Sequence, residues 1–161
     1  MTLTTCLWFD GNAREAAEFY SSIFPDSGVD ANWMAPAETP SNDVGSEVVV
    51  GFTIFGANFI GLNGGPAFTF NEAISFQIPC VNQAEIDRYW DVLTSDGGKA
   101  GRCGWLKDKF GVSWQVVSPA MQGYLGGSDP AGAKAATEAM LAMSKIDLDR
   151  LRSAYEMAAG S

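Results

Sequence analysis

The stretch that decides the fold is DKFGVSWQVV, residues 108–117. It opens with an Asp and reaches a turn-forming glycine at Gly111, which indicates a tight turn. The residues after the glycine alternate in character, which predicts a β-strand. Gln115 then places a polar amide in an otherwise apolar strand. This amide either contacts a ligand or metal, or it satisfies a polar neighbour inside the protein.

A related stretch, FGANFIGL, occupies residues 55–62 and precedes FGVSWQVV by 55 positions. Both contain Phe-Gly, a later aromatic residue and further apolar residues in register. The predicted helices correspond as well, since Phe19-Tyr20 precedes Tyr89-Trp90 by 70 positions. The chain is therefore predicted to repeat a strand–helix–strands unit twice.

Apolar residues at helical spacing predict helices over residues 13–24 and 83–93. Alternating or β-prone runs bounded by Gly, Pro and Asn predict the strands. These strands cover residues 2–9, 29–35, 47–56, 58–66 and 73–78, with two more inside residues 104–117.

Two more helices are predicted in the C-terminal part of the chain. The first starts at Asp129-Pro130, with Asp as N-cap and Pro at the first helical position. The second starts near Asp147, where Asp147 and Asp149 suit the helix dipole. Its apolar residues either pack on their own domain or form a dimer contact, and we favour the dimer contact because open sheet edges are often covered by a partner. The apolar set is Met140, Leu141, Met143, Ile146, Leu151 and Tyr155.

Composition excludes several classes of function. The chain has 161 residues, 47% of them apolar, which is enough for one domain with a buried core. Its net charge of −9 argues against binding to nucleic acid or to an anionic membrane surface. No apolar run is long enough to span a membrane, and the N-terminus does not resemble a secretory signal, so we expect a cytoplasmic protein.

The counts of His and Cys limit the possible chemistry further. The chain has no His, which excludes a Ser-His-Asp triad, a Cys-His dyad and the usual zinc ligand sets. Its three cysteines are odd in number and form no CxxC motif, which argues against a disulfide framework. Cys80 and Cys103 are predicted to have no functional role.

Three stretches, residues 7–27, 104–119 and 139–155, resemble the PhnB-like branch of the vicinal oxygen chelate superfamily, which has the glyoxalase/bleomycin-resistance fold. They are LWFDGNAREAAEFYSSIFPDS, GWLKDKFGVSWQVVSP and AMLAMSKIDLDRLRSAY. This branch often carries the label 3-demethylubiquinone 3-methyltransferase. The resemblance implies a single α+β domain in which two βαβββ modules form an open cup of mixed sheet, with C-terminal helices. It also implies a homodimer. The expected parts are residues 2–66, 72–120 and 128–159.

In metal-using members of the superfamily, four inward-facing positions hold the ion. The resemblance places these positions at about Thr4, Ile60, Ala73 and Gln115. A hydroxyl, an apolar side chain, a methyl and an amide do not make a site for a divalent metal, so we expect no metal and no other cofactor. The glycines of residues 63–66 and 97–101 do not lie between a strand and a following helix, as a dinucleotide-type loop does. We interpret them as flexible turns.

Strand periodicity divides each strand into a cup face and a helix-covered face. The cup-facing candidates for a ligand site combine polar groups with aromatic rings, as small-molecule sites commonly do. Each also has a structural explanation: a core amide, a buried thiol or a packed ring. Lys107 and Asp108 suit turn capping better than acid–base chemistry. The candidates are Cys6, Trp8, Ser75, Gln77, Trp105, Ser113 and Gln115.

Three functions stay open at this point. The first is a metal-free homodimer that binds a small molecule in an apolar cup, with amide groups at Gln77 and Gln115. The second is an enzyme of the same superfamily, such as a lyase, isomerase, dioxygenase or methyltransferase, acting on an unknown small molecule. The third is a structural dimer with a vestigial cavity.

Overall fold

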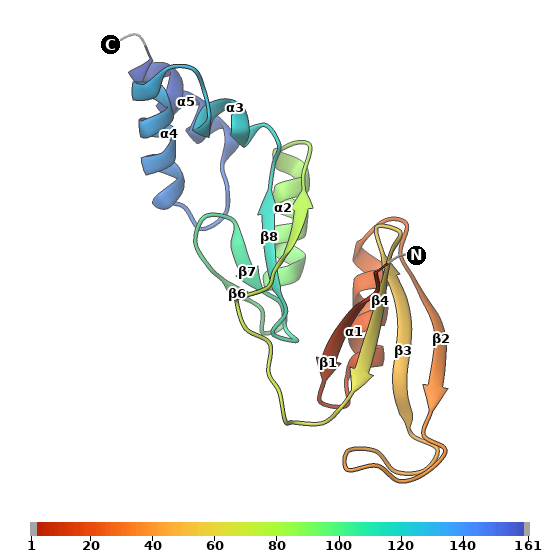
Figure 1. Cartoon of the computed structure of the whole chain (residues 1–161). Helices are drawn as coiled ribbons and strands as arrows, with labels where there is room; N and C mark the ends of the chain where they lie inside the picture. The colour runs from red at the N-terminus through yellow and green to blue at the C-terminus, as the bar shows by residue number, and fades with distance from the viewer. Residues whose placement is uncertain (1–2, 160–161) are drawn as a thin grey trace. The chain divides into compact units, whose positions relative to one another are not determined.

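The computed structural model of the protein describes residues 3–159 (Figure 1). Its chain folds as two compact units that divide between Phe70 and Asn71. Thr2, the first residue of the first predicted strand, lies outside the described residues. Among the described helices, none combines the length and apolar character needed to cross a membrane.

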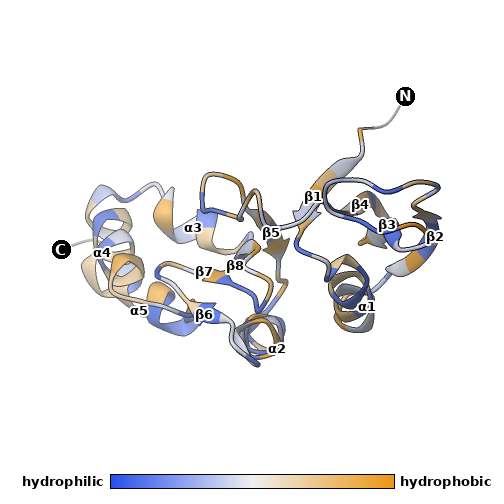
Figure 2. Cartoon of the chain, turned by 90° about the horizontal axis from the view of Figure 1, so that it is seen from below, coloured by the Kyte–Doolittle hydropathy of each residue, from blue (hydrophilic) through white to orange (hydrophobic). Residues whose placement is uncertain are grey.

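The first unit is a four-stranded mixed sheet with one helix. The sheet order is β1-β4-β3-β2, with β1 and β4 parallel and the other neighbours antiparallel. Figure 2 shows α1 beside the strands of this unit. Its elements are β1 (Thr5–Phe9), α1 (Ala13–Ile23), β2 (Gly28–Met34), β3 (Glu47–Ile54) and β4 (Ala57–Asn63).

The second unit repeats this topology. Its sheet order is β5-β8-β7-β6, again with one parallel pair, β5 and β8. The predicted internal repeat and the predicted α+β fold of two βαβββ modules are therefore confirmed. The elements are β5 (Phe76–Pro79), α2 (Gln83–Thr94), β6 (Lys99–Ala100), β7 (Trp105–Lys107) and β8 (Ser113–Val117).

Each sheet buries one face against its helix. Along β3 burial alternates strictly, and Val50 and Phe52 are buried together with Tyr20 of α1. In the second unit Trp114 and Val116 of β8 are buried on the face that packs on α2, while Gln115 is half-buried on the opposite face. We call the face of each sheet not covered by its helix the open face.

The strand predicted over residues 73–78 begins later than expected. β5 starts at Phe76, and Ala73 lies in a turn. The cause is Asn71, whose side-chain oxygen accepts a hydrogen bond from the Ala73 amide at 2.9 Å. Such an Asx-type bond competes with the β-ladder for the backbone donor. The two-residue strand β6 and the short helix α3 (Met121–Leu125) were not predicted.

The C-terminal helices α4 (Pro130–Leu141) and α5 (Leu148–Ala158) begin at the two predicted aspartates. The Asp129 carboxylate accepts from the Gly132 amide at 2.8 Å, and the Asp147 carboxylate accepts from the Arg150 amide at 2.9 Å. Both bonds satisfy amide groups that a helix N-terminus leaves without an internal partner.

Most of the apolar residues in this C-terminal part pack inside the second unit. Met143, Ile146 and Leu151 are buried, and the Tyr155 hydroxyl accepts a hydrogen bond from the Asp129 amide at 3.1 Å. Leu141 stays 55% exposed. Internal packing, which the sequence left as the alternative to a dimer contact, therefore accounts for most of this apolar set.

Polar contacts tie the same segment to α2. The Gln83 amide donates to the Ile146 carbonyl at 2.9 Å, and its oxygen accepts from the Leu148 amide at 3.0 Å. Lys145 pairs with Asp87 at 2.9 Å. The hydrogen bond to Asp87 raises the pKa of the Lys145 ammonium, and the pKa of the Asp87 carboxyl falls for the same reason.

The turn of the opening stretch is organised by Asp108. This carboxylate is buried and accepts three hydrogen bonds: from the amides of Phe110 (2.9 Å) and Val112 (3.0 Å), and from the Trp114 indole (2.8 Å). Gly111 has a φ of +89°, which a residue with a Cβ rarely adopts. The predicted turn-capping role of Asp108 is what the structure shows.

We predict that Asp108→Ala lowers the free energy of unfolding by about 2–4 kcal/mol, because it leaves buried N–H donors without acceptors. Asp108→Asn should have a smaller effect, since its oxygen can still cap the turn while its NH₂ group opposes the indole N–H. Urea denaturation measures both variants. The control is Asp43→Ala at an exposed loop position, where a change within about 0.5 kcal/mol is expected. Equal stability of Asp108→Ala and Asp43→Ala would contradict the assignment.

Candidate functional site

Three of the predicted site residues form one row on the open face of the second sheet. Gln115 of β8 is the register partner of Gln77 on β5 and of Trp105 on β7. The residues next to them in sequence, Trp114 and Leu106, are buried on the helix-covered face. Strand alternation therefore places the two amides and the indole side by side.

Gln115 bonds to neighbouring side chains. Its Nε2 donates to the Ser75 hydroxyl at 2.7 Å, and its Oε1 accepts from the Gln77 amide at 3.0 Å. The sequence left open whether the Gln115 amide contacts a ligand or satisfies a polar neighbour. The structure shows that it has polar neighbours inside the protein. Gln77 itself is exposed, so this chain of side chains reaches the surface.

A pocket of about 340 Å³ lies on the same sheet. It is open rather than enclosed, and it combines an indole ring with two lysines and a carboxylate. Ser113, another predicted site residue, lines it and is buried, with its hydroxyl donating to the Asn71 carbonyl at 3.4 Å. The lining residues are Glu72, Lys99, Ala100, Gly101, Trp105, Leu106, Lys107 and Ser113.

One of the two lysines is paired. The Lys107 ammonium lies 2.5 Å from the Glu72 carboxylate. This hydrogen bond favours the ionised carboxylate and lowers the pKa of Glu72. Lys107, which was predicted to cap the turn, therefore lines the pocket.

The other two candidates, Cys6 and Trp8, lie on the open face of the first sheet. Their register partners on β4 are Ile60 and Leu62, so this face is mainly apolar. The Trp8 indole donates to the Gly65 carbonyl at 2.7 Å, and its ring meets that of Phe68 edge-on, with centroids 4.9 Å apart. Trp8 thus has both a hydrogen-bond and a packing partner within its own unit.

The three cysteines differ in burial. Cys6 is exposed, Cys103 is half-buried, and Cys80 is fully buried. Burial raises the pKa of the Cys80 thiol to about 12, which keeps it protonated at neutral pH.

The four positions implied for a metal do not fit a divalent ion. Thr4 and Ala73 are exposed and lie outside the strands, Ile60 has no donor atom, and the Gln115 amide is bonded to its neighbours. Within residues 3–159, no group of three Cys, Asp or Glu side chains is placed to hold a metal. Hard divalent cations need several oxygen ligands, which this set cannot provide.

Two of the glycines that a methyl-donor loop would need, Gly64 and Gly98, are required by close packing. A Cβ at Gly64 would lie 2.3 Å from the Trp8 ring, and a Cβ at Gly98 would lie 2.2 Å from the Leu93 carbonyl. Gly64 follows β4 and precedes β5, and Gly98 lies between α2 and β6. Neither joins a strand to a following helix, so a dinucleotide-type loop is not present in either stretch. Gly64 and Gly98 are tightly packed, whereas a Cβ at Gly97 would meet nothing within 4 Å.

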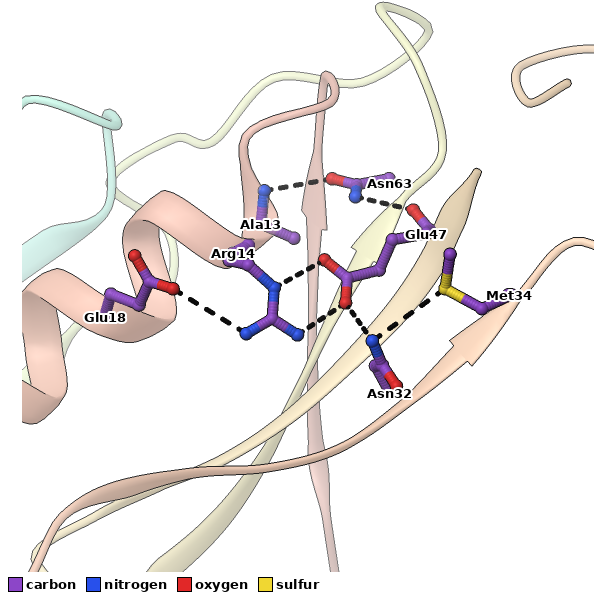
Figure 3. A network of polar contacts seen from close by, with 7 residues as sticks. All are labelled: Ala13, Arg14, Glu18, Asn32, Met34, Glu47 and Asn63. Atoms are coloured by element: carbon purple, nitrogen blue, oxygen red, sulfur yellow. Dashed lines mark hydrogen bonds and ion pairs between the residues drawn. The ribbon is translucent and has the colours of Figure 1, made fainter. Parts of the chain in front are cut away.

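A polar network in the first unit was not predicted (Figure 3). The Arg14 guanidinium donates to both carboxylate oxygens of Glu47, at 2.8 and 2.5 Å. Arg14 thereby lowers the pKa of the Glu47 carboxyl. Glu47 also accepts from Asn32 on β2 at 2.5 Å. This ion pair joins α1 to β3. Its two residues are 33 positions apart, so no local spacing in the sequence predicts it.

The buried Asn63 completes this network. It accepts from the Ala13 amide at 2.9 Å, at the start of α1, and donates to the Glu47 carbonyl at 2.8 Å. The network therefore ties α1 to three strands and explains these charged and polar residues as structural.

We predict that Gly64→Ala destabilises the protein by about 1–3 kcal/mol, because the added methyl must displace the Trp8 indole. Thermal or urea unfolding measures the effect. Gly123→Ala is the matched control, since a Cβ there meets nothing within 4 Å and the residue lies in a helix. That control should be neutral or slightly stabilising. If Gly64→Ala were equally neutral, the packing explanation for this glycine would be wrong.

Comparisons with known proteins agree with this architecture. A search of curated proteins found no match. A solved structure of a putative 3-demethylubiquinone-9 3-methyltransferase, a PhnB protein from Bacillus cereus, is 31% identical, with a TM-score of 0.65 over 73% of this chain and 99% of that one. A protein from Pseudomonas aeruginosa, 20% identical with a TM-score of 0.55 over 71% and 94% of the chains, shares the fold. The family model 3-demethylubiquinone-9 3-methyltransferase matches residues 1–117, the part that holds both sheets. The chain belongs to this family, in the PhnB-like branch of the glyoxalase superfamily.

Proposed function

We propose that this chain is a metal-free protein that binds a small molecule on the open face of its second sheet. The observation that carries the proposal is the hydrogen-bonded chain Ser75–Gln115–Gln77, which lies in one row with Trp105 beside the 340 Å³ pocket. Polar groups that converge beside an aromatic ring are typical of small-ligand sites.

The polarity of this face supports the proposal. The helix-covered face of the same sheet is apolar and closed, with Ile78, Leu106 and Val116 buried. Gln115 is half-buried, and a half-buried amide stabilises a fold less than an apolar side chain in the same place would. The amides can exchange their mutual hydrogen bonds for bonds to a ligand at small cost, because one of them is already exposed.

The family label suggests methyl transfer, and the Bacillus cereus relative carries it as a putative activity. Two observations lead us to propose binding instead. Gly64 and Gly98, which could form part of a nucleotide-type loop, are packed against Trp8 and against the end of α2. The positions expected to hold a metal offer one hydroxyl and one engaged amide.

We also propose that the protein forms a homodimer in the cytoplasm. The outer strand β2 pairs only with β3, and its Trp33 and Met34 are 54% and 46% exposed. An exposed strand edge with large apolar side chains is suited to pairing with a second copy. The exposed thiol of Cys6 suits a reducing compartment.

Binding is tested by ¹H–¹⁵N NMR titration with four probes: benzoate, benzamide, indole and phenylphosphonate. At least one probe should shift the Trp105 indole and Gln115 amide signals, and Gln115→Leu should weaken that binding at least fivefold while the fold is retained. Gln122→Leu, at an exposed position on α3, is the control and should leave binding unchanged. Elemental analysis of the same sample should find no stoichiometric metal. No shift with any probe, or one bound metal per chain, would overturn the proposal.

The dimer is tested by sedimentation equilibrium, which should give twice the chain mass of 17.1 kDa. Trp33→Glu should yield monomers, because it buries a charge at the proposed contact. Leu141→Glu adds the same charge at an exposed apolar position on α4 and should remain dimeric. A monomeric wild type, or dissociation by Leu141→Glu alone, would refute the β2 contact.

A further inference from the structure

We propose that the pocket on the second sheet selects small planar anions, with Lys99 pairing with a carboxylate and Trp105 stacking on the planar part. This inference rests on the proposed function and specifies its class of ligand. It depends on three features of the pocket: two lysines that are cross-strand partners, the carboxylate that pairs with one of them, and a half-buried Trp residue in its lining.

The two lysines are direct cross-strand partners. Lys99 of β6 pairs in register with Lys107 of β7. Side chains directly opposite each other on antiparallel strands lie on the same face about 5 Å apart at Cβ, and like charges in such a pair destabilise the sheet. An anion bound between the two ammonium groups would relieve this repulsion.

Glu72 relieves the repulsion between Lys99 and Lys107 only in part. Its carboxylate is bonded to Lys107, whose side chain is 29% exposed. Lys99 is exposed and forms no ion pair with any residue in the range 3–159. The pocket thus keeps one uncompensated positive charge, which suits a single carboxylate better than a phosphate dianion.

This local charge is opposite to that of the whole chain. The protein has 19 acidic and 10 basic residues, and its net charge of −9 repels anions over most of the surface. Two lysines and one glutamate line the pocket. Selection for an anion at this place therefore requires the pocket residues themselves and does not follow from the charge of the protein as a whole.

Trp105 provides the planar surface. It is half-buried, lies two residues before Lys107 on the same face of β7, and is the register partner of Gln115. Gly101 is bonded to it across the strands, its amide donating to the Trp105 carbonyl at 2.8 Å. A Cβ at Gly101 would lie 2.7 Å from the Trp105 carbonyl oxygen, so this close approach of the two backbones requires a glycine. The half-buried Trp105 side chain lines the pocket together with Lys99. Stacking on an aromatic face is worth about 0.5–1.5 kcal/mol beyond the buried area for protein aromatic pairs.

The inference is tested with two of the same probes, benzoate and its neutral isostere benzamide, in NMR titrations at low salt. Benzoate should bind about three- to fivefold more tightly than benzamide. This ratio of affinities corresponds to the free energy of a partly exposed ion pair. Lys99→Gln should remove this preference and leave benzamide binding unchanged. Lys134→Gln, at a 77% exposed lysine on α4, is the matched control and should keep the preference.

Glu72→Gln gives a test of opposite sign. Removing this carboxylate frees Lys107, so benzoate should bind about two- to threefold more tightly while benzamide binds as before. If both probes bind equally well to the wild type, or if Lys99→Gln keeps the preference for benzoate, the proposed anion selectivity is wrong. The proposed binding function would then still hold. If neither probe shifts the Trp105 signal while indole does, the same conclusion holds. If no probe binds, both proposals fail.

Discussion

The buried carboxylate of Asp108 is the interaction on which the second unit depends. It holds the amides of Phe110 and Val112 in the turn and at the same time anchors the indole of Trp114 on the following strand. Turn geometry sets the register of the two strands that it connects. Since side chains alternate between the two faces of a strand, a slip of one residue would turn Gln115 into the core and Trp114 out to the open face. The pairing of Gln115 with Trp105 therefore follows from one capped turn.

The two units have the same topology and different chemistry. Both have the strand order first–fourth–third–second and one parallel pair, and each helix lies on one face of its sheet. In the first unit the open face carries Cys6, Trp8, Ile60 and Leu62, and its charged pair Arg14–Glu47 joins α1 to β3. In the second unit the open face carries amides, lysines and one indole. Repetition of a fold therefore does not imply repetition of a site, because alternation along the strands leaves one face free to vary.

The C-terminal helices extend the chain beyond the part that matches the family model, which ends at residue 117. They are bound to the second unit by the side chain of Gln83, which bonds backbone groups on both sides of Asp147, and by Lys145 between two aspartates of α2. Apolar residues in this segment are largely used for packing within the unit. This explains why an apolar helical pattern in sequence, taken alone, did not distinguish a dimer contact from internal packing.

The sequence by itself determined the repeat, the two central helices, the caps at Asp129 and Asp147, and the alternation that separates Gln115 from Trp114. These features depend on local periodicity and on backbone chemistry within a few residues, so they can be predicted without knowing the fold. Only the tertiary structure decided what Gln115 bonds to, that Lys99 faces Lys107, and that Arg14 pairs with Glu47. It also decided that Gly64 and Gly98 are tightly packed. The three pairings join residues that strand register and packing bring together over separations of 8 to 40 positions. Register is set by turns and packing that no single stretch of sequence contains.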